Sequence, residues 1–584
     1  MNYSEVAEKY AELEDISGRN EMTKVLAELL SKTSRAELPM LVYMTQGKLR
    51  PDYEGVELGL AEKLALRALA TAAGIRPDKV YLAYVKHGDI GAAALELLTT
   101  RNQGTLFSEG LTVRRVYETL LKIAHQSGSG SVEAKLRELG SLLNDASPLE
   151  AKFIMRTVTG ELRLGVADYT VLDAAAAAFL GGKEARPAVE RAYNVHPDLG
   201  MVVERVASLG LKGVEQIGVE VGIPIRPMLA ERMSSAQSIV KKMGDKTVAA
   251  EYKLDGERLQ IHRDGEEVKL FSRRLEVITG HYPDAAELVK KYVTPKRAIL
   301  EAEVVAINED TGEYLPFQEL MHRRRKHGVE KAIADYPVAL NFFDILLAGS
   351  SDLTDRAYTA RRKKLEQAVK QTERTRLVPA LATADPSRIE DFMEEAIENG
   401  CEGLVVKDPA STYRAGAREF AWIKLKREYR SELSDTIDLV IIGAFHGKGR
   451  RAGTYGTYLL GAYDDKRGLY TSVAKIGTGF SDEDLARIPK VLKPFESHVR
   501  PPGIESNMVP DIWFRPGIVI ETIAAELTLS PIHTAAMGRI RPGAGISLRF
   551  PKFTGKIRDD KGPEDATTVE EIVGMYQRQI KQIQ

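Results

Sequence analysis

The stretch EYKLDGER, Glu251 to Arg258, decides how the middle of this 584-residue chain is interpreted. A strand-like run at 247–254 carries Lys253 near its end, and Asp-Gly then forms a turn before a second strand-like run at 257–265. Lys253 is therefore expected at a loop edge, where its ammonium group faces a ligand. Alone the pattern is weak evidence for a ligand site, because an ordinary hairpin with a surface lysine has the same sequence pattern.

Further segments follow in order, each a strand-like run that carries charged or aromatic residues. They are FSRRLE (271–276), LEAEVV (300–305), NFFD (341–344), EGLVVK (402–407) and WIKLK (422–426). Helical patterns at 361–372 and 387–398 interrupt the strands, so we predict an α+β domain. It begins at GIPIRPMLA (222–230), where two prolines disfavour both helix and central strand.

The flanking regions differ from this middle part. Residues 1–220 space apolar side chains three and four apart, which predicts helices. From about Ile437 the chain is rich in glycine and in short strand-like runs, which predicts a small β-barrel closed by a helix over 569–584. We expect three domains: helical over 1–220, α+β over 221–430 and barrel over 431–584.

The composition names no partner. Lys and Arg total 82 and Asp and Glu total 83, a net charge of -1, whereas small nucleic-acid-binding domains often have a pI above about 9. The single cysteine, Cys401, excludes an intramolecular disulfide and a zinc site with two thiolates. The N-terminus lacks the features of a signal peptide, and no apolar run approaches the ~18 residues of a membrane span. We therefore expect a cytoplasmic protein.

Taken together, the ordered segments resemble the motifs of covalent nucleotidyltransferases, and most closely those of ATP-dependent DNA ligases of the archaeal and eukaryotic replicative type. ELRLGVADYTVLDA (161–174) resembles the signature of their DNA-binding domain, and 222–230 resembles the start of their adenylation domain. LRFPKF (548–553) through IRDDK (557–561) resembles their last motif. The resemblance implies an all-α DNA-binding domain, an α+β nucleotidyltransferase core and a C-terminal OB-fold barrel.

The resemblance implies an enzyme that seals nicks in duplex DNA through lysyl-AMP and DNA-adenylate, releasing AMP and pyrophosphate, in replication, repair, recombination and cell division. Lys253 would be the adenylated nucleophile, and Glu303 and Glu402 would hold Mg²⁺ or Mn²⁺. Glu251 would accept a hydrogen bond from the adenine amino group, and Phe343 would stack on adenine. The remaining nucleotide contacts would come from Arg258, Arg273, Glu303, Arg418, Lys424 and Lys426, and pyrophosphate would be oriented by Arg549, Arg558 and Lys561.

The chemistry of the residues agrees with these roles. A lysine nucleophile must lose its proton, and neighbouring cations together with a metal ion favour the neutral amine. Many relatives have Asp then Thr or Gly before the glutamate of the third motif, whereas this chain has Glu301-Ala302-Glu303. Glu303 is the natural match, and whether Glu301 shares its role stays open.

Contacts to DNA and to a partner protein are expected from local patterns. Basic clusters that could meet phosphates are Arg323–Lys326, Arg361–Lys364, Lys448–Arg451 and Lys475–Gly479, each of which is otherwise a solvated surface. Gln103, Leu106 and Phe107 resemble a short sliding-clamp peptide, with Leu-Phe for an apolar pocket, although both apolar residues could pack under their own loop. A hinge is expected at 426–434.

Several rival functions remain. An RNA ligase or an mRNA guanylyltransferase is disfavoured by the long helical region and by the last motif. A NAD-dependent ligase is disfavoured because its zinc finger would need four cysteines. A catalytically silent DNA-binding or clamp-tethering protein is disfavoured by Lys253, Glu303, Glu402 and Lys424. We expect a monomer associated with the nucleoid, and leave the tolerance for ADP or NAD and the preferred metal open.

Overall fold

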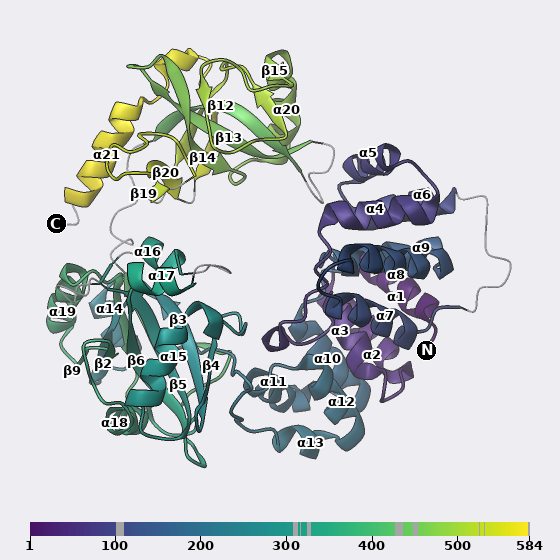
Figure 1. Cartoon of the computed structure of the whole chain (residues 1–584). Helices are drawn as coiled ribbons and strands as arrows, with labels where there is room; N and C mark the ends of the chain where they lie inside the picture. Colours follow the sequence, from purple (N-terminus) through teal and green to yellow (C-terminus); the bar gives the residue numbers. More distant parts are fainter. Residues whose placement is uncertain are drawn as a thin grey trace. The chain divides into compact units, whose positions relative to one another are not determined.

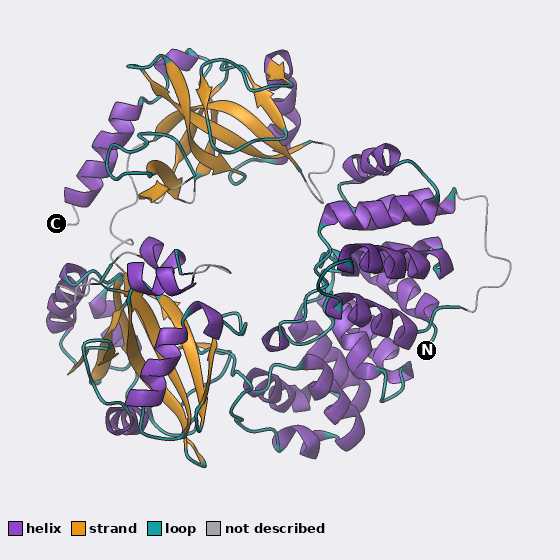
Figure 2. Ribbon diagram, viewed as in Figure 1, coloured by secondary structure: helices purple, strands orange, loops and turns teal. Residues whose placement is uncertain are grey.

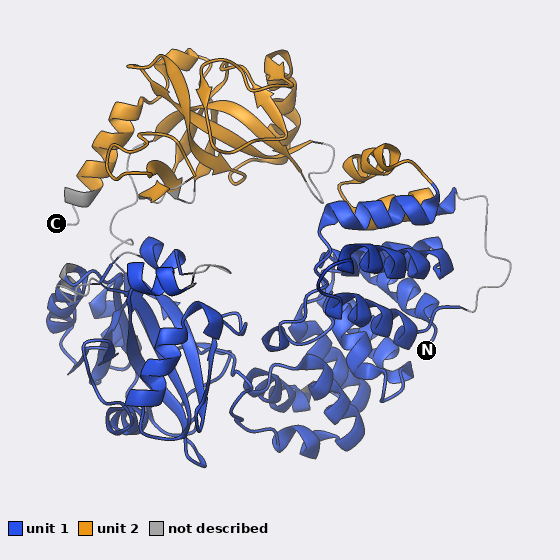
Figure 3. Ribbon diagram, in the orientation of Figure 1, with its two compact units in different colours: residues 1–74, 98–427 blue, residues 75–97, 428–584 orange. Residues whose placement is uncertain are grey.

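The computed structural model describes residues 1–100, 110–307, 314–315, 317–323, 329–426, 436–447, 454–524, 526–530, 532–549 and 551–581. The chain forms two compact units (Figure 3). The larger contains residues 1–74 and 98–427, and the smaller contains residues 75–97 and 428–584. The division into three domains at 220 and 430 remains a prediction.

The described residues up to Glu215 are mainly helical, as predicted (Figures 1 and 2). Helix α2 illustrates why, because it buries Met22, Val25, Leu26, Leu29 and Leu30 along one face. The helices are α1 (Tyr3–Glu14), α2 (Arg19–Lys32), α3 (Leu38–Thr45), α4 (Glu62–Ala73), α5 (Pro77–His87), α6 (Ile90–Thr99), α7 (Val113–His125), α8 (Ser131–Asp145), α9 (Pro148–Val158), α10 (Asp168–Phe179), α11 (Arg186–Val195), α12 (Leu199–Leu209) and α13 (Leu211–Glu215). Of these, α5 and most of α6 belong to the smaller unit.

The rest of the larger unit is built on two sheets. The first has strand order β1-β11-β10-β2-β9, and the second has β4-β3-β5-β6-β7 with β8 added on β6. The strands are β1 (Leu229–Arg232), β2 (Val248–Lys253), β3 (Glu257–Asp264), β4 (Glu267–Phe271), β5 (Arg297–Ala306), β6 (Val338–Ala348), β7 (Ser351–Asp352), β8 (Thr375–Leu377), β9 (Ala380–Thr383), β10 (Gly403–Lys407) and β11 (Arg418–Lys426). Because β2 and β3 lie in different sheets, residues 254–256 cross between the sheets, and the hairpin alternative is wrong.

Helices cover the outer face of each sheet. The first sheet packs on α14 (Ala236–Lys242) and α19 (Pro386–Glu398), and the second packs on α15 (Pro283–Tyr292) and α18 (Tyr358–Ala368). Two short helices complete this part, α16 (Phe317–Met321) and α17 (Val329–Asp335). The inner faces meet through a small core that includes Ile299, Leu346 and Trp422. Polar residues of both inner faces are therefore brought opposite each other.

Arg226 joins the helices of the larger unit to its sheets. Its Nη2 donates to Asp168 at 2.7 Å, and its guanidinium lies 4.2 Å from the ring centre of Tyr193. Its backbone N–H donates to the Asn194 carbonyl at 2.8 Å, and its own carbonyl accepts from Gly416 N at 3.0 Å. The segment that leads into β1 is thus fixed at Arg226 through both backbone polar groups of this residue.

The smaller unit is mainly a strongly curled β-sheet, which is consistent with the expected OB-fold. The sheet contains β12 to β18 and β21, and β19 pairs with β20. The bounds are β12 (Ile437–His446), β13 (Tyr455–Asp464), β14 (Leu469–Ile476), α20 (Asp482–Leu492), β15 (Glu496–Ser497), β16 (Ile504–Glu505), β17 (Ile512–Phe514), β18 (Val519–Ile523), β19 (Glu526–Ser530), β20 (Gly545–Arg549), β21 (Lys552–Ile557) and α21 (Val569–Lys581).

Candidate active site

The inner face of the first sheet carries a cluster of charged side chains. Along β2, β10 and β11, alternate residues pack on α14 and α19, and the residues between them face the second sheet. The residues facing inward include Glu251, Lys253, Lys407, Lys424 and Lys426. The pairing places Lys253 and Lys426 on either side of Gly403, and Glu251 and Lys424 on either side of Val405.

The second sheet supplies the facing side chains. Arg258 of β3 lies opposite Glu303 of β5, and Phe343 comes from β6. The two faces enclose a cavity of about 190 Å³. Among the residues predicted from the sequence, its lining includes Glu251, Lys253, Arg258, Arg273, Glu303, Phe343, Arg418 and Lys424. The structure therefore brings these eight together around one space.

Glu402 and Lys426 lie beside this cavity, in contact with Lys253 or its partner. The Lys253 ammonium and Glu402 Oε2 form an ion pair, and Lys426 Nζ binds the same oxygen at 2.7 Å. Burial alone would raise the pKa of Glu402, but Lys253 and Lys426 outweigh it and lower the pKa. Burial and the charge of Glu402 raise the pKa of nearby Asp255 to about 6. Lys253 is thus flanked by carboxylates.

Glu303 is the most perturbed carboxyl of the cavity. Burial raises its pKa to about 7, against the opposing charges of Lys253 and Arg258. On the other sheet, burial lowers the pKa of Lys424, and the positive charges of Lys426 and Arg418 lower it further. A cation entering between the sheets would stabilise Glu303 in its ionised form.

The two glutamates of the third motif occupy different environments. Glu301 accepts two hydrogen bonds from Arg258 Nη2, at 2.8 and 2.9 Å, and one from the Tyr413 hydroxyl at 3.0 Å. Arg258 Nη1 donates to the Met228 carbonyl at 2.9 Å, so both terminal nitrogens of this arginine already have protein partners. Glu301 orients Arg258 and does not line the cavity, whereas Glu303 does.

Three residues without an assigned role hold Glu251 in place. Its Oε1 accepts from the Tyr358 hydroxyl and from Arg362 Nη1 at 3.1 Å, and its Oε2 forms an ion pair with Lys407 Nζ at 2.5 Å. Lys407 could have been predicted from the sequence, because alternation along β10 places it on the same inward face as Val405. Tyr358 and Arg362 could not have been predicted in this way, because their spacing on α18 matches a solvated helix face.

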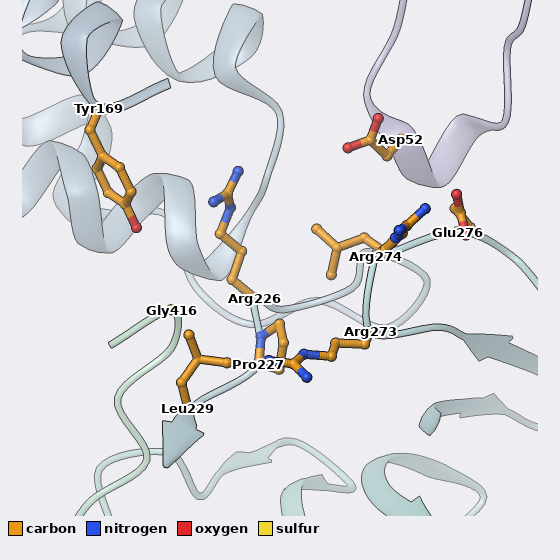
Figure 4. Close-up of a pocket in the computed structure, with 10 residues that line it drawn as sticks. Asp52, Tyr169, Arg226, Pro227, Leu229, Arg273, Arg274, Glu276 and Gly416 are labelled. Carbon is orange, nitrogen blue, oxygen red and sulfur yellow. The ribbon is translucent and has the colours of Figure 1, made fainter. Parts of the chain in front are cut away.

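A second cavity, of about 550 Å³, adjoins the first and shares Leu229 and Arg273 with it. Figure 4 shows three arginines around it, Arg226, Arg273 and Arg274, together with the carboxylates of Asp52 and Glu276. Asp52 and Tyr169 come from the helices, and the other lining residues come from the segments around the two sheets. The helical part of the larger unit thus contributes to the surroundings of the site.

Three arginines from two of the expected DNA-contacting clusters are corrected by the structure. Arg361 is fully buried and binds Asp344 through Nε at 2.8 Å and Nη2 at 3.0 Å. Arg323 is also buried and pairs with Asp284, and Arg362 binds Glu251. These three arginines balance internal carboxylates and do not face DNA. Within Lys475–Gly479, the Lys475 ammonium lies 3.9 Å from the ring centre of Phe445.

Other predicted segments lie outside the described residues. These are 324–326 of the first cluster, Lys448–Arg451, the hinge from 427 onward, and the peptide with Gln103, Leu106 and Phe107. In the smaller unit, Arg558 and Lys561 both bind Asp438 Oδ2, at 2.6 and 2.8 Å, and Arg549 ends β20. Asp438 thus brings together two of the three cations of the last motif.

In the described part of the chain, no group of three or more His, Cys, Asp or Glu side chains could hold a metal ion. No helix there is long and apolar enough to cross a membrane.

Comparisons with known proteins agree along the whole chain. The family described as "ATP dependent DNA ligase domain" matches residues 227–426, "DNA ligase N terminus" matches 2–176, and "ATP dependent DNA ligase C terminal region" matches 451–561. The chain is 50% identical to a DNA ligase of Cenarchaeum symbiosum, over 100% of this chain and 98% of that protein. It is also 50% identical to a DNA ligase of Nitrosopumilus maritimus, over 100% and 99%. The solved structure "Pmar-Lig_PreS3" shares the fold, with a TM-score of 0.53 at 17% identity over 94% of this chain and 99% of that one.

Proposed function

The chain belongs to the ATP-dependent DNA ligases of the archaeal type, which join nicked DNA at the cost of ATP, and we propose that Lys253 is the residue that carries AMP between the two substrates. One observation carries this proposal. Lys253 ends β2 at the edge of the cavity between the sheets, in contact with Glu402 and surrounded by Arg273, Arg418 and Lys424. These cations suit attack on a triphosphate, because their charges neutralise the phosphates.

In this proposal Lys253 Nζ loses a proton and attacks the α-phosphorus of ATP. A P–N bond forms and the bond to pyrophosphate breaks. A 5'-phosphate oxygen of the nick then displaces the lysine, and the 3'-hydroxyl finally displaces AMP to form the phosphodiester. Arg418 and Lys424 are placed to meet the phosphates, while Phe343 and Glu251 face the base from opposite sheets. Catalysis here consists mostly of positioning and charge stabilisation.

We propose that Glu303 and Glu402 hold Mg²⁺ or Mn²⁺. Mg²⁺ is usually bound through one or two carboxylates together with substrate phosphates, so a protein site with three ligands is not required. The raised pKa of Glu303 fits this role, because its buried carboxyl forms no ion pair with the described residues and a bound metal would supply the opposite charge. When bound, the metal would neutralise phosphate charge.

The second cavity supports a place for the nick. Its three arginines adjoin the nucleotide cavity through Leu229 and Arg273, so a DNA phosphate there would approach the adenylated lysine. Of the basic clusters predicted from the sequence, Arg361 and Arg323 are excluded from this role by their burial.

The test is labelling with ATP that carries a radioactive α-phosphate. Wild-type protein and Lys241→Ala, an exposed lysine on α14, should become labelled, and Lys253→Ala should not. Lys253→Ala should still seal a nick that has been adenylated in advance, because that step no longer needs the nucleophile. Retained label in Lys253→Ala would refute the assignment. Parallel reactions with GTP and NAD test the alternative nucleotide specificities.

The remaining parts of the proposal rest on the sequence. Gln103, Leu106 and Phe107 would bind a sliding clamp, and the enzyme would act as a monomer at the nucleoid in replication, repair and recombination. Loss of clamp pull-down in Phe107→Ala, with folding and nick sealing intact, would support the clamp peptide. Unchanged pull-down would exclude it.

A further inference from the structure

We propose that Tyr358 and Arg362 of α18, together with Lys407 of β10, are positioning residues that select adenine over guanine by holding Glu251 so that its Oε2 stays open to a donor from the base. This inference rests on the proposed contact between Glu251 and the base. It adds residues that lie behind the cavity: of the three, only Lys407 is part of the cavity lining.

The hydrogen bonds of Glu251 leave its Oε2 open to a ligand. A carboxylate offers about four lone-pair sites on its two oxygens. Oε1 accepts from the Tyr358 hydroxyl and from Arg362 Nη1, whereas Oε2 forms an ion pair with Lys407 Nζ. Both sites on Oε1 are therefore taken by protein donors, and the charge of Lys407 holds Oε2 in place. A donor from a ligand in the cavity would bind Oε2.

The donors are themselves fixed, so the carboxylate does not rotate freely. Arg362 Nη2 donates to the Val378 carbonyl at 2.9 Å, and the Tyr358 backbone N–H donates to the Ser411 carbonyl at 2.8 Å. Lys407 is 1% exposed, and its ammonium lies 4.4 to 5.1 Å from the ring centres of Trp422, Tyr358 and Phe343. Lys407 therefore contacts both Glu251 and the aromatic ring on which the base is proposed to stack.

This arrangement distinguishes the two purines by their groups at position 6. Adenine has an amino group there, which donates to Glu251 Oε2. Guanine has a carbonyl oxygen, which would face a carboxylate that offers no donor. A buried acceptor left unpaired and placed against another acceptor is costly, so the guanine nucleotide is rejected.

The experiment compares formation of the enzyme–nucleotide adduct from ATP and from purine riboside triphosphate, which lacks the 6-amino group. The readout is the ratio of kcat/KM for the two nucleotides. Tyr358→Phe and Arg362→Ala should lower this ratio about three- to tenfold, which is the range expected for one weakened hydrogen bond. The loss should appear in KM for ATP, while purine riboside triphosphate reacts as in the wild type. Lys363→Ala, exposed on the same helix, should keep the wild-type ratio.

The outcomes separate this inference from the proposed function. If Glu251→Gln lowers the ratio but Tyr358→Phe and Arg362→Ala do not, the positioning role is overturned while base recognition by Glu251 stands. If Glu251→Gln leaves the ratio unchanged, the proposed contact itself fails, and the positioning role fails with it. Equal losses for both nucleotides in Tyr358→Phe and Arg362→Ala would indicate a purely structural role and would also overturn the inference. Partial recovery in Arg362→Lys would support it, because the lysine restores a cationic donor.

Discussion

Gly256, in the loop of residues 254–256 that follows Lys253, has no space for a side chain. A Cβ atom at this position would lie 2.3 Å from the Val304 carbonyl oxygen and 2.9 Å from Glu303 Cγ. The loop crosses from one sheet to the other at this point, so it has no room to move away from β5. The glycine is needed for close approach, and its substitution acts directly on the carboxyl that faces Lys253.

We therefore predict that Gly256→Ala reduces lysyl-AMP formation at least tenfold and destabilises the protein by about 1–3 kcal/mol, the usual cost of overpacking. Labelling with α-phosphate-labelled ATP and unfolding in denaturant measure the two effects. Gly218→Ala is the control, because a Cβ there meets nothing within 4 Å. Wild-type labelling by Gly256→Ala would contradict the prediction.

The predictability of the site residues follows from the elements that carry them. Lys253, Glu303 and Lys424 lie on strands, where alternation fixes which face a side chain occupies. Residues on helices gave no such guide. Their sequence pattern places Arg361 and Arg362 in a basic surface cluster. In the structure Arg361 is buried against Asp344, and Arg362 packs against Glu251. Only the tertiary fold identifies the buried carboxylate beneath a helix.

At the scale of elements, α18 is anchored to β6 by the ion pair between Arg361 and Asp344, whose side chains are both fully buried. We predict that Arg361→Ala destabilises the protein by about 3–5 kcal/mol, because it leaves the Asp344 charge unpaired. Denaturant unfolding measures this loss. Lys364→Ala, exposed on the same helix, should change stability by less than about 0.5 kcal/mol. A folded Arg361→Ala protein with wild-type stability and weaker DNA binding would restore the discarded role.

His262 on β3 gives the fold a dependence on pH. Its Nδ1 accepts from Gly222 N at 2.9 Å, and its Nε2 lies 3.0 Å from Gln260 Oε1. Burial, with a smaller effect of Lys269, lowers its pKa to about 3. The unfolded chain, with an ordinary histidine pKa of about 6.5, therefore binds the proton more readily. Acidification through this range favours unfolding.

Between about pH 6.5 and pH 3 we predict that this histidine costs up to about 1.4 kcal/mol of stability per pH unit. Unfolding measured at pH 7.5 and pH 5 should show a smaller pH dependence in His262→Gln than in the wild type. His125→Gln, at an exposed position on α7, should behave as the wild type does. An identical slope in His262→Gln would contradict the prediction.

Element types were predictable, and their partners were not. The helices at 361–372 and 387–398 are confirmed as α18 and α19, although α18 begins three residues and ends four residues earlier than expected. The two strands expected at 247–254 and 257–265 are also confirmed, as β2 and β3, but they lie in different sheets. Local sequence reports alternation and turns, whereas sheet membership depends on β9 and β10, more than 100 residues away.

At the scale of the whole molecule, Arg226 links the helices of the larger unit to the cavity that we propose for the nick. It pairs with Asp168 and Tyr193 of the helices, and it also lines the second cavity. We predict that Arg226→Ala keeps lysyl-AMP formation within about threefold of wild type, because Lys253 and Glu402 are untouched, but slows sealing of nicked duplex at least tenfold. Parallel labelling and sealing assays measure the two steps. Equal losses in both would contradict the prediction.

The near balance of 82 cationic and 83 anionic side chains has a structural explanation. Arg361 and Lys407 are each paired with a buried carboxylate, so they contribute to the count without reaching the surface. A total of charged residues therefore overstates what is available to a polyanion. This is why composition could not predict the DNA partner, while the ordered motifs could.

The chain has two tryptophans, Trp422 in the larger unit and Trp513 in the smaller. Trp422 lines the cavity between the two sheets, edge-on to Phe343, with the charges of Lys407 and Arg258 within 6 Å of its ring. Indole emission responds to nearby charge and to stacking. A Trp513→Phe protein would therefore contain one tryptophan, located at the proposed nucleotide site, and binding of a nucleotide there could be followed optically in real time without any added dye.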